Sequence, residues 1–265
     1  MGFVITNSLQ KGGVAKTTGT GMLSYLMSRD GYKVLAIDMD SQGNLTELLT
    51  GRASNEFKDK SVLEAMVYRE PKKYIVPVMD NLDVLPANNF LALFSRWLYT
   101  GDLFGEEIPV HGGVIRQLSN ILLDLREEYD FIMIDTPPSL SEQTTNALVA
   151  SDYVLVPYEC SYFCYQAIPN FFETVEIAQN ASPYGCEILG IIRTLSDKRR
   201  SDAKLFNDKI AEDFPDLVFE TIITRRASIG RLAFYGFEDN EELDDAIKQY
   251  QPVYKEIIQR LGLNK

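Results

Sequence analysis

The sequence predicts an α/β protein built on a mostly parallel, doubly wound sheet with helices on both faces. Short apolar runs alternate with segments of helical periodicity along most of the chain. The runs are apolar at nearly every position, which is typical of strands that helices cover on both sides. The 265 residues, 45% of them hydrophobic and 24% charged, are expected to form one domain spanning residues 1–265.

Each element follows from a local pattern. The first helix is typical: Met22, Leu23, Leu26 and Met27 lie on one side, and Gly31 follows as a stop signal. In sheets of this kind ligands bind beyond the carboxyl ends of the strands, so a site is expected there. Strands are expected at residues 3–6, 33–38, 82–85, 131–135, 153–157, 188–194 and 217–223. Helices are expected at residues 17–29, 90–98, 114–128, 141–150, 171–179 and 204–213.

A further helical pattern lies near the C-terminus. Its polar positions are acidic, whereas a helix on a membrane surface carries a basic polar face. We therefore expect core packing and no membrane partner. Pro252 lies within the pattern and is expected to break or kink the helix. The apolar positions at helical spacing are Leu243, Ile247, Tyr250, Tyr254, Ile257 and Leu261.

The charge balance restricts the possible partners. The net charge is −12, from 26 basic and 38 acidic side chains, whereas a nucleic-acid-binding protein usually has a basic footprint. Any DNA contact therefore requires a local basic patch. The N-terminus has no basic segment typical of a signal peptide, and no apolar run approaches the ~20 residues of a membrane span. Together with three cysteines too sparse for a metal cluster, this predicts a cytoplasmic protein.

Residues 10–18 carry the most informative motif, Gln10-Lys11-Gly12-Gly13-Val14-Ala15-Lys16-Thr17-Thr18. It follows the first expected strand and opens the first expected helix. Glycines allow successive backbone N–H groups to point at one anion, and the helix N-terminus adds partial positive charge. Lys16 would then neutralise the β- and γ-phosphates of a nucleotide, and the Thr17 hydroxyl would bind Mg²⁺.

The motif departs from the ordinary Walker A pattern, because Gln10 and Ala15 occupy its two glycine positions. It instead matches K-G-G-x-x-K-S/T and resembles the deviant Walker A motif of the family that contains ParA, MinD and the nitrogenase iron protein. The resemblance implies a P-loop NTPase fold with ATP and Mg²⁺ as cofactors. It also implies that Lys11 reaches across a homodimer to the partner's ATP. Nucleotide contacts are implied for Lys11, Gly12, Gly13, Val14, Ala15, Lys16, Thr17 and Thr18.

Two acidic motifs end apolar strands. Alternation places Asp38 and Asp40 on the same side of an extended chain, and residues 38–44 resemble the ParA segment DxDPQGN. The resemblance implies that Asp40 orients or activates the attacking water and that Asp38 supports the magnesium and loop network. Asp135, followed by Thr-Pro-Pro, resembles a Walker B aspartate that holds Mg²⁺.

Phosphoryl transfer mainly needs positioning and charge neutralisation. The candidate catalytic residues are therefore Lys11, Lys16 and Asp40. Two later segments resemble parts of the family that line the rest of the nucleotide site. Residues 154–159 contribute Pro157 and Glu159, while Thr224 and Arg226 stand where the family's Pro-Arg-Asn segment touches adenine.

The resemblance covers nearly the whole chain and, within the family, is closest to the ParA DNA-partition ATPases. Cluster cysteines, a basic amphipathic C-terminal helix and a tyrosine-rich tail, which mark other branches, are missing from this sequence. The resemblance implies a weak ATP hydrolase that segregates plasmid or chromosomal DNA. Its ATP-bound dimer would bind non-specific DNA and so associate with the nucleoid. A ParB-type, centromere-binding adaptor would trigger hydrolysis.

Non-specific DNA binding requires cationic side chains aimed at phosphates. The candidates lie in two loops: Lys198, Arg199 and Arg200 in one, and Arg225 and Arg231, beside Arg226, in the other. Arg225 matches the family arginine used in this way. An alternative stays open, in which these are ordinary solvated or ion-paired charges. The chain would then be a protein-positioning or regulatory ATPase switch of the same family that does not bind DNA.

Overall fold

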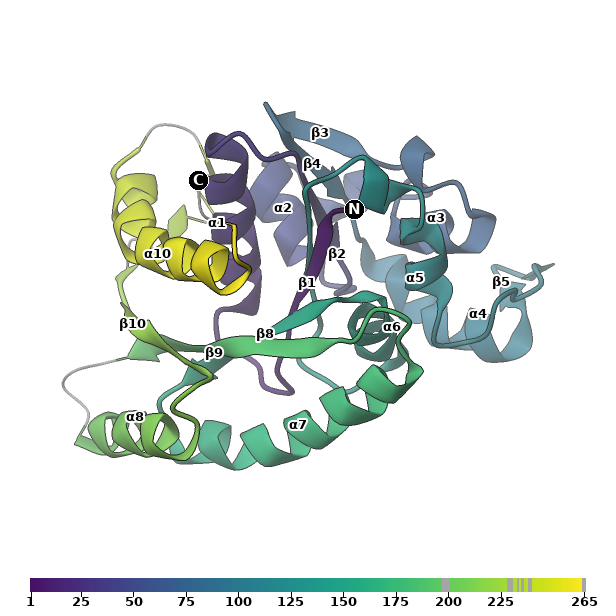
Figure 1. Ribbon diagram of the computed structural model, residues 1–265. Coiled ribbons are helices and arrows are strands. Elements are labelled where there is room, and N and C mark those ends of the chain that lie inside the picture. Colours follow the sequence, from purple (N-terminus) through teal and green to yellow (C-terminus); the bar gives the residue numbers. More distant parts are fainter. Residues whose placement is uncertain (197–200, 228–230, 233, 235, 238–239, 264–265) are drawn as a thin grey trace.

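A computed structural model describes residues 1–196, 201–227, 231, 232, 234, 236, 237 and 240–263. The main sheet has eight strands in the order β10-β9-β8-β1-β7-β2-β4-β3 (Figure 1). Its paired strands run parallel except β3 and β4. The strands are β1 (Phe3–Asn7), β2 (Val34–Asp38), β3 (Val76–Met79), β4 (Leu82–Leu85), β7 (Phe131–Asp135), β8 (Tyr153–Glu159), β9 (Glu187–Ser196) and β10 (Val218–Thr224), and a separate hairpin pairs β5 (Asp102–Leu103) with β6 (Glu106–Glu107).

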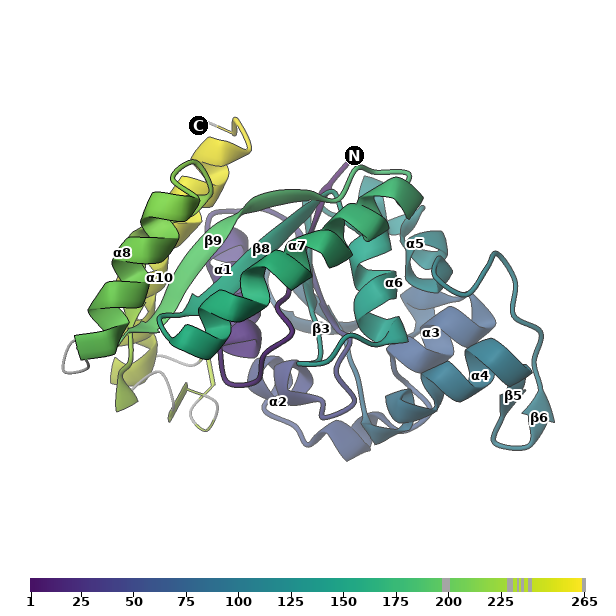
Figure 2. The same cartoon turned by 90° about the horizontal axis from the view of Figure 1, so that it is seen from below.

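Helices cover both faces of the sheet, which confirms the doubly wound arrangement (Figures 1 and 2). Alternate residues of β1 show why: Ile5 packs with α1 and α10 on one face, and Val4 packs with the α3–α6 region on the other. Within the described ranges, no helix is long and apolar enough to cross a membrane. The helices are α1 (Lys16–Arg29), α2 (Asn44–Thr50), α3 (Val62–Tyr68), α4 (Phe94–Thr100), α5 (Gln117–Leu122), α6 (Glu142–Ala150), α7 (Tyr162–Ala181), α8 (Ser201–Asp213) and α10 (Glu241–Arg260).

The expected strands are all present, but several helices differ from the prediction. The helix expected at 114–128 is only α5 followed by a 3₁₀ turn, Leu125–Glu127. The helix expected at 90–98 begins as the 3₁₀ segment Asn89–Leu93. The prediction missed α2, α3 and β3, although the capping box of Ser61 and Glu64 is a readable start signal for α3.

Pro252 was expected to break or kink this helix, and it does not break it, because α10 is one helix from Glu241 to Arg260. Helix α7 likewise continues through Pro169. Both prolines are exposed, so the backbone carbonyl that loses its helical partner can turn to water instead. The expected core packing is confirmed, since Leu243, Tyr250 and Ile257 are buried.

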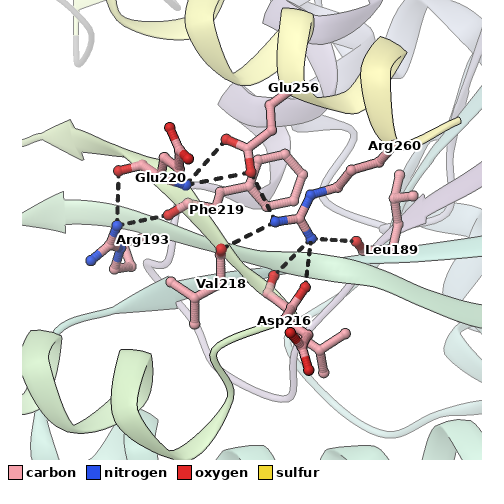
Figure 3. Close-up of polar contacts among 9 residues, drawn as sticks. Leu189, Arg193, Asp216, Val218, Phe219, Glu220, Glu256 and Arg260 are labelled. Atoms are coloured by element: carbon pink, nitrogen blue, oxygen red, sulfur yellow. Dashed lines mark hydrogen bonds and ion pairs between the residues drawn. The ribbon is translucent and has the colours of Figure 1, made fainter. Parts of the chain in front are cut away.

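One arginine fastens the end of α10 to the sheet (Figure 3). The Arg260 guanidinium donates to the carbonyl oxygens of Leu189, Leu217 and Val218 at 2.9, 3.0 and 3.1 Å. It also lies 4.1 Å from the ring centroid of Phe219. Gly190 leaves the necessary space, because a Cβ there would approach the guanidinium to 2.6 Å. Strands β9 and β10 are therefore held by the helix that covers them.

Replacing Arg260 with alanine should lower the free energy of unfolding by about 3 kcal/mol, because several carbonyl oxygens lose a charged donor. Urea unfolding measures this. Lys255→Ala, an exposed change on the same helix, is the control and should shift the value by less than about 0.5 kcal/mol. Equal effects of the two substitutions would contradict the anchoring role of Arg260.

Candidate nucleotide site

Three polar side chains stand in one row at the carboxyl ends of neighbouring strands. Asn7 of β1 is in register with Asp135 of β7, and Asp135 is in register with Asp38 of β2. All three are buried. The parallel register therefore brings the two sequence-predicted acidic motifs together beneath the start of α1.

The loop between β1 and α1 has the expected position and a strained residue. Gly13 has a φ of 73° and Ala15 a φ of 63°, both in the left-handed region. Glycine adopts this conformation freely, whereas an L-residue with a Cβ is disfavoured there. Neighbouring elements brace the loop, because Thr194 of β9 donates to the Val14 carbonyl oxygen at 3.0 Å and Gln10 to Thr174 of α7 at 3.3 Å.

Lys16 is buried at the first turn of α1. Its ammonium donates to the carbonyl oxygens of Lys11 at 2.7 Å and Leu9 at 3.3 Å, so it lies against the loop. Burial lowers the pKa of Lys16, while Asp135 and Asp40 act in the opposite direction. An anionic ligand held by the loop would therefore raise the pKa of Lys16 and offset the effect of burial.

The Thr17 hydroxyl donates to Asp135 Oδ2 at 2.7 Å. Two oxygen ligands this close fit neighbouring positions around Mg²⁺, which usually takes one or two protein ligands and fills the rest with phosphate and water. The described residues contain no group of three or more His, Cys, Asp or Glu side chains arranged to hold a metal. Burial raises the pKa of Asp135 to about 8, with Asp38 adding to the effect.

The two carboxylates of the DxD segment have different surroundings. Buried Asp38 accepts from the Thr46 backbone N–H at 2.9 Å, the Thr46 hydroxyl at 2.8 Å and the Asp40 N–H at 3.1 Å. Its burial raises its pKa to about 6, although the bonds from Thr46 act in the opposite direction. The carboxylate of half-buried Asp40 accepts from the Gln42 N–H at 3.0 Å and lines a cleft. Asp38 therefore holds the loop, while Asp40 faces the ligand space.

The contact from Thr46 was not predicted, because α2 itself was missed. Thr46 also accepts from the backbone N–H of Ala87 at 2.9 Å and so joins three segments. Its place in the first turn of a helix that follows the DxD segment is the signal that could have identified it.

A cleft of about 520 Å³ contains the predicted phosphate-binding residues. A larger cleft of about 660 Å³ lies between α2 and β3, away from the phosphate loop. Lys16, Thr17 and Asp40 line the smaller cleft, and the buried Asp135 contacts the Thr17 hydroxyl, so we take this cleft as the site. Its lining comprises Gly12, Gly13, Val14, Ala15, Lys16, Thr17, Thr18, Asp40, Ser41, Gln42, Asn44, Thr136, Pro137, Pro138 and Ser139.

Six predicted residues of the nucleotide site lie outside this lining. Lys11 precedes the first lining residue, Gly12, and Asp38 is buried behind Asp40. Pro157 is buried within β8. Glu159 pairs with Arg225 at 3.7 Å. Thr224 donates its N–H and hydroxyl to Gln249 of α10, both at 2.9 Å, and Arg226 pairs with Asp245 of α10.

The predicted DNA-contacting residues fall into two groups. Lys198, Arg199 and Arg200 lie outside the described residues. Arg225 and Arg231 are exposed, and each pairs with a carboxylate: Arg225 with Glu159, and Arg231 with Glu242 at 3.0 Å.

Comparisons with known proteins identify the family of the chain. A family model described as an AAA domain matches residues 2–185. The sporulation initiation inhibitor protein Soj of Bacillus subtilis is 31% identical over 240 residues, which cover 89% of each chain. The chain belongs to the ParA family of P-loop ATPases. The resemblance of residues 10–18, 38–44 and 131–138 to ParA motifs is therefore confirmed at the level of the family.

Two solved structures of similar proteins contain a bound adenine nucleotide. A plasmid partition protein of Borrelia burgdorferi B31, bound to AMPPNP, has a TM-score of 0.75 and 27% identity and covers 98% of each chain. Cobyrinic acid a,c-diamide synthase of Mycobacterium smegmatis, with bound ADP and magnesium, has a TM-score of 0.75 and 29% identity over 95% of this chain and 96% of that one. Related proteins thus bind adenine nucleotides, with magnesium in the second case.

Substituting Ala15 with glycine should raise the free energy of unfolding of the nucleotide-free protein by about 1 kcal/mol, because it relieves the left-handed strain. Gly13→Ala is the matched opposite. Its Cβ would meet nothing within 4 Å, so only the positive φ opposes it, and we expect a loss of similar size. Urea unfolding of both variants measures the effect. A loss of stability in Ala15→Gly would contradict the strain.

The raised pKa of Asp135 predicts a pH dependence. A carboxyl with a higher pKa in the folded state stabilises the fold most at low pH, and this contribution is lost as the pH rises to the folded-state pKa. The loss extends from about 3.8 to about 8 for Asp135 and to about 6 for Asp38. Between pH 6 and 8, Asp135 should therefore cost up to about 1.4 kcal/mol per pH unit in the absence of ligand.

Asp135→Asn should flatten that decline, as measured by urea unfolding at pH 6, 7 and 8 without nucleotide or Mg²⁺. Asp124→Asn, at an exposed position, serves as the control and should retain the parental slope. If Asp135→Asn also retains it, the decline originates in other groups.

Proposed function

We propose that this protein is an ATP-dependent DNA-segregation ATPase that acts on a plasmid or chromosome. The observation that carries the proposal is that Lys16, Thr17 and Asp40 line the cleft bordered by the phosphate loop, with Asp135 hydrogen-bonded to Thr17 behind it. The relationship to Soj and to a plasmid partition protein supports the choice of cargo.

Each residue has a role that its position supports. Lys16 and the loop N–H groups hold the β- and γ-phosphates, and Thr17 with Asp135 holds Mg²⁺, which supplies charge neutralisation to the transferring phosphoryl group. Asp40, supported from behind by Asp38, orients the attacking water. Because the site positions reactants and offers few other catalytic groups, we expect a weak intrinsic ATPase.

Lys11 completes the site of a second subunit. Lys11 does not line the cleft of its own subunit, and its backbone carbonyl oxygen accepts a hydrogen bond from the Lys16 ammonium. We propose that ATP binding forms a homodimer in which each Lys11 reaches the partner's nucleotide. The ATP-bound dimer binds non-specific DNA on the nucleoid, and a ParB-type adaptor stimulates hydrolysis and release.

A second candidate function has its own support. The described arginines at the proposed DNA surface are already paired with carboxylates, and the whole chain has a net charge of −12. These observations favour a protein-positioning or regulatory ATPase switch that uses the same dimer without DNA.

Fluorescence anisotropy of a random-sequence duplex separates the two functions. The Asp40→Ala protein, which should bind ATP and hydrolyse little, is titrated with ATP and with ADP at two salt concentrations. Binding only with ATP, weakened by salt because counterions are released, is the result expected for segregation. Arg225→Ala should then lower affinity several-fold and reduce the salt slope by about 1.

Arg96→Ala is the matched control for Arg225→Ala. Arg96 is 59% exposed and ion-paired, much as Arg225 is 58% exposed and ion-paired, but it lies on α4. If no duplex binds in either nucleotide while ATP-dependent dimers form, the regulatory switch replaces DNA segregation as the function.

A further inference from the structure

The Lys11 ammonium lies over an aromatic ring at the edge of the nucleotide cleft. Its Nζ is 5.6 Å from the centroid of Phe163, in the first turn of α7. Figures 1 and 2 both show the loop after β1 beside α7. A contact at this distance lies within the range of a cation–π interaction, in which the negative face of the ring attracts the cation.

Core packing does not explain Phe163. Its side chain is 72% exposed, and its neighbour Tyr162, whose ring lies 5.6 Å away, is 53% exposed. A phenylalanine left this far in water gains little from burial. Besides its neighbour Tyr162, the ring contacts the Lys11 side chain of the loop.

Lys11 is not committed to a carboxylate. No acidic side chain among the described residues forms an ion pair with it, although the chain has 38 acidic groups and Asp40 borders the same cleft. A ring attracts an ammonium without cancelling its charge. The contact thus keeps the cation available to an anion while limiting the conformations of a long side chain.

We propose that Phe163 is a positioning residue for Lys11, holding its ammonium ready for a phosphate of the partner subunit's nucleotide. This inference rests on the proposed ATP-dependent dimer. Less conformational entropy is then lost when Lys11 binds across the dimer. The symmetric dimer contains two such pairs, so their effects on its stability combine.

The test measures dimerisation by sedimentation with ATP and Mg²⁺ in the Asp40→Ala background. Phe163→Leu keeps an apolar side chain but removes the ring, and it should weaken the dimer about fivefold. Phe163→Tyr keeps the ring face and should dimerise like the parent. ATP affinity of the monomer, which depends on the subunit's own Lys16, should not change in either variant.

Two controls isolate the cation–π contact. Ile177→Ala removes a side chain that is also 72% exposed on α7, away from Lys11, and should leave dimerisation unchanged. In a Lys11→Ala background, Phe163→Leu should have no further effect. A further fivefold loss there would show that Phe163 acts by packing and would overturn the inference.

Lys11→Ala alone separates failure of the inference from failure of the proposed function. If Lys11→Ala weakens the dimer but Phe163→Leu does not, Phe163 has no positioning role and the sandwich dimer stands. If Lys11→Ala dimerises like the parent, Lys11 does not bridge the subunits. That result would contradict both the proposed Lys11-bridged dimer and the positioning role of Phe163.

Discussion

The structure depends on burying two carboxyl groups and a lysine ammonium close together at the carboxyl ends of neighbouring parallel strands. Asp38 and Asp135 are fully buried, and Lys16 is nearly so. Charged groups removed from water are unfavourable unless they are paired or hydrogen-bonded. Hydroxyl and backbone donors partly offset this cost, and burial raises the pKa of each carboxyl, which favours its neutral form. An ATP phosphate with Mg²⁺ would complete the charge balance, which links ligand binding directly to stability.

Contacts from neighbouring elements hold Asp38, Asp135 and the phosphate loop in place. Thr46 connects Asp38 to α2 and, through Ala87, to the segment after β4. Thr194 holds the phosphate loop from β9, and β9 is in turn held by Arg260 of α10. The C-terminal helix α10 therefore helps to hold the phosphate loop in place by way of strand β9. Helix α2 holds Asp38 in place from the other side of the site.

The surface presents a different electrostatic problem. An acidic protein can bind DNA only where basic side chains exchange their carboxylate partners for phosphates. Arg225 and Arg231 are exposed and pair with the half-buried Glu159 and Glu242, and ion pairs that remain open to water contribute little to stability. Such an exchange costs little energetically and depends on salt. For the proposed DNA binding, breaking these pairs is therefore a modest cost. In the proposed dimer, Lys11 is held by a ring and has no ion pair with a described carboxylate to break before it binds a phosphate.

The sequence by itself determined the local features of this protein. Apolar runs with defined ends located the strands, and the K-G-G-x-x-K-T, DxD and D-T-P-P segments predicted the phosphate loop and both acidic motifs, because each depends on neighbours in the chain. Tertiary structure decided which distant groups meet. The left-handed Ala15, the contact of Thr46 with Asp38, and the pairing of Thr224 and Arg226 with α10 depend on packing between elements. Short helices such as α2 were missed for the same reason, since seven residues gain their stability from the sheet beneath them and little from their own propensity.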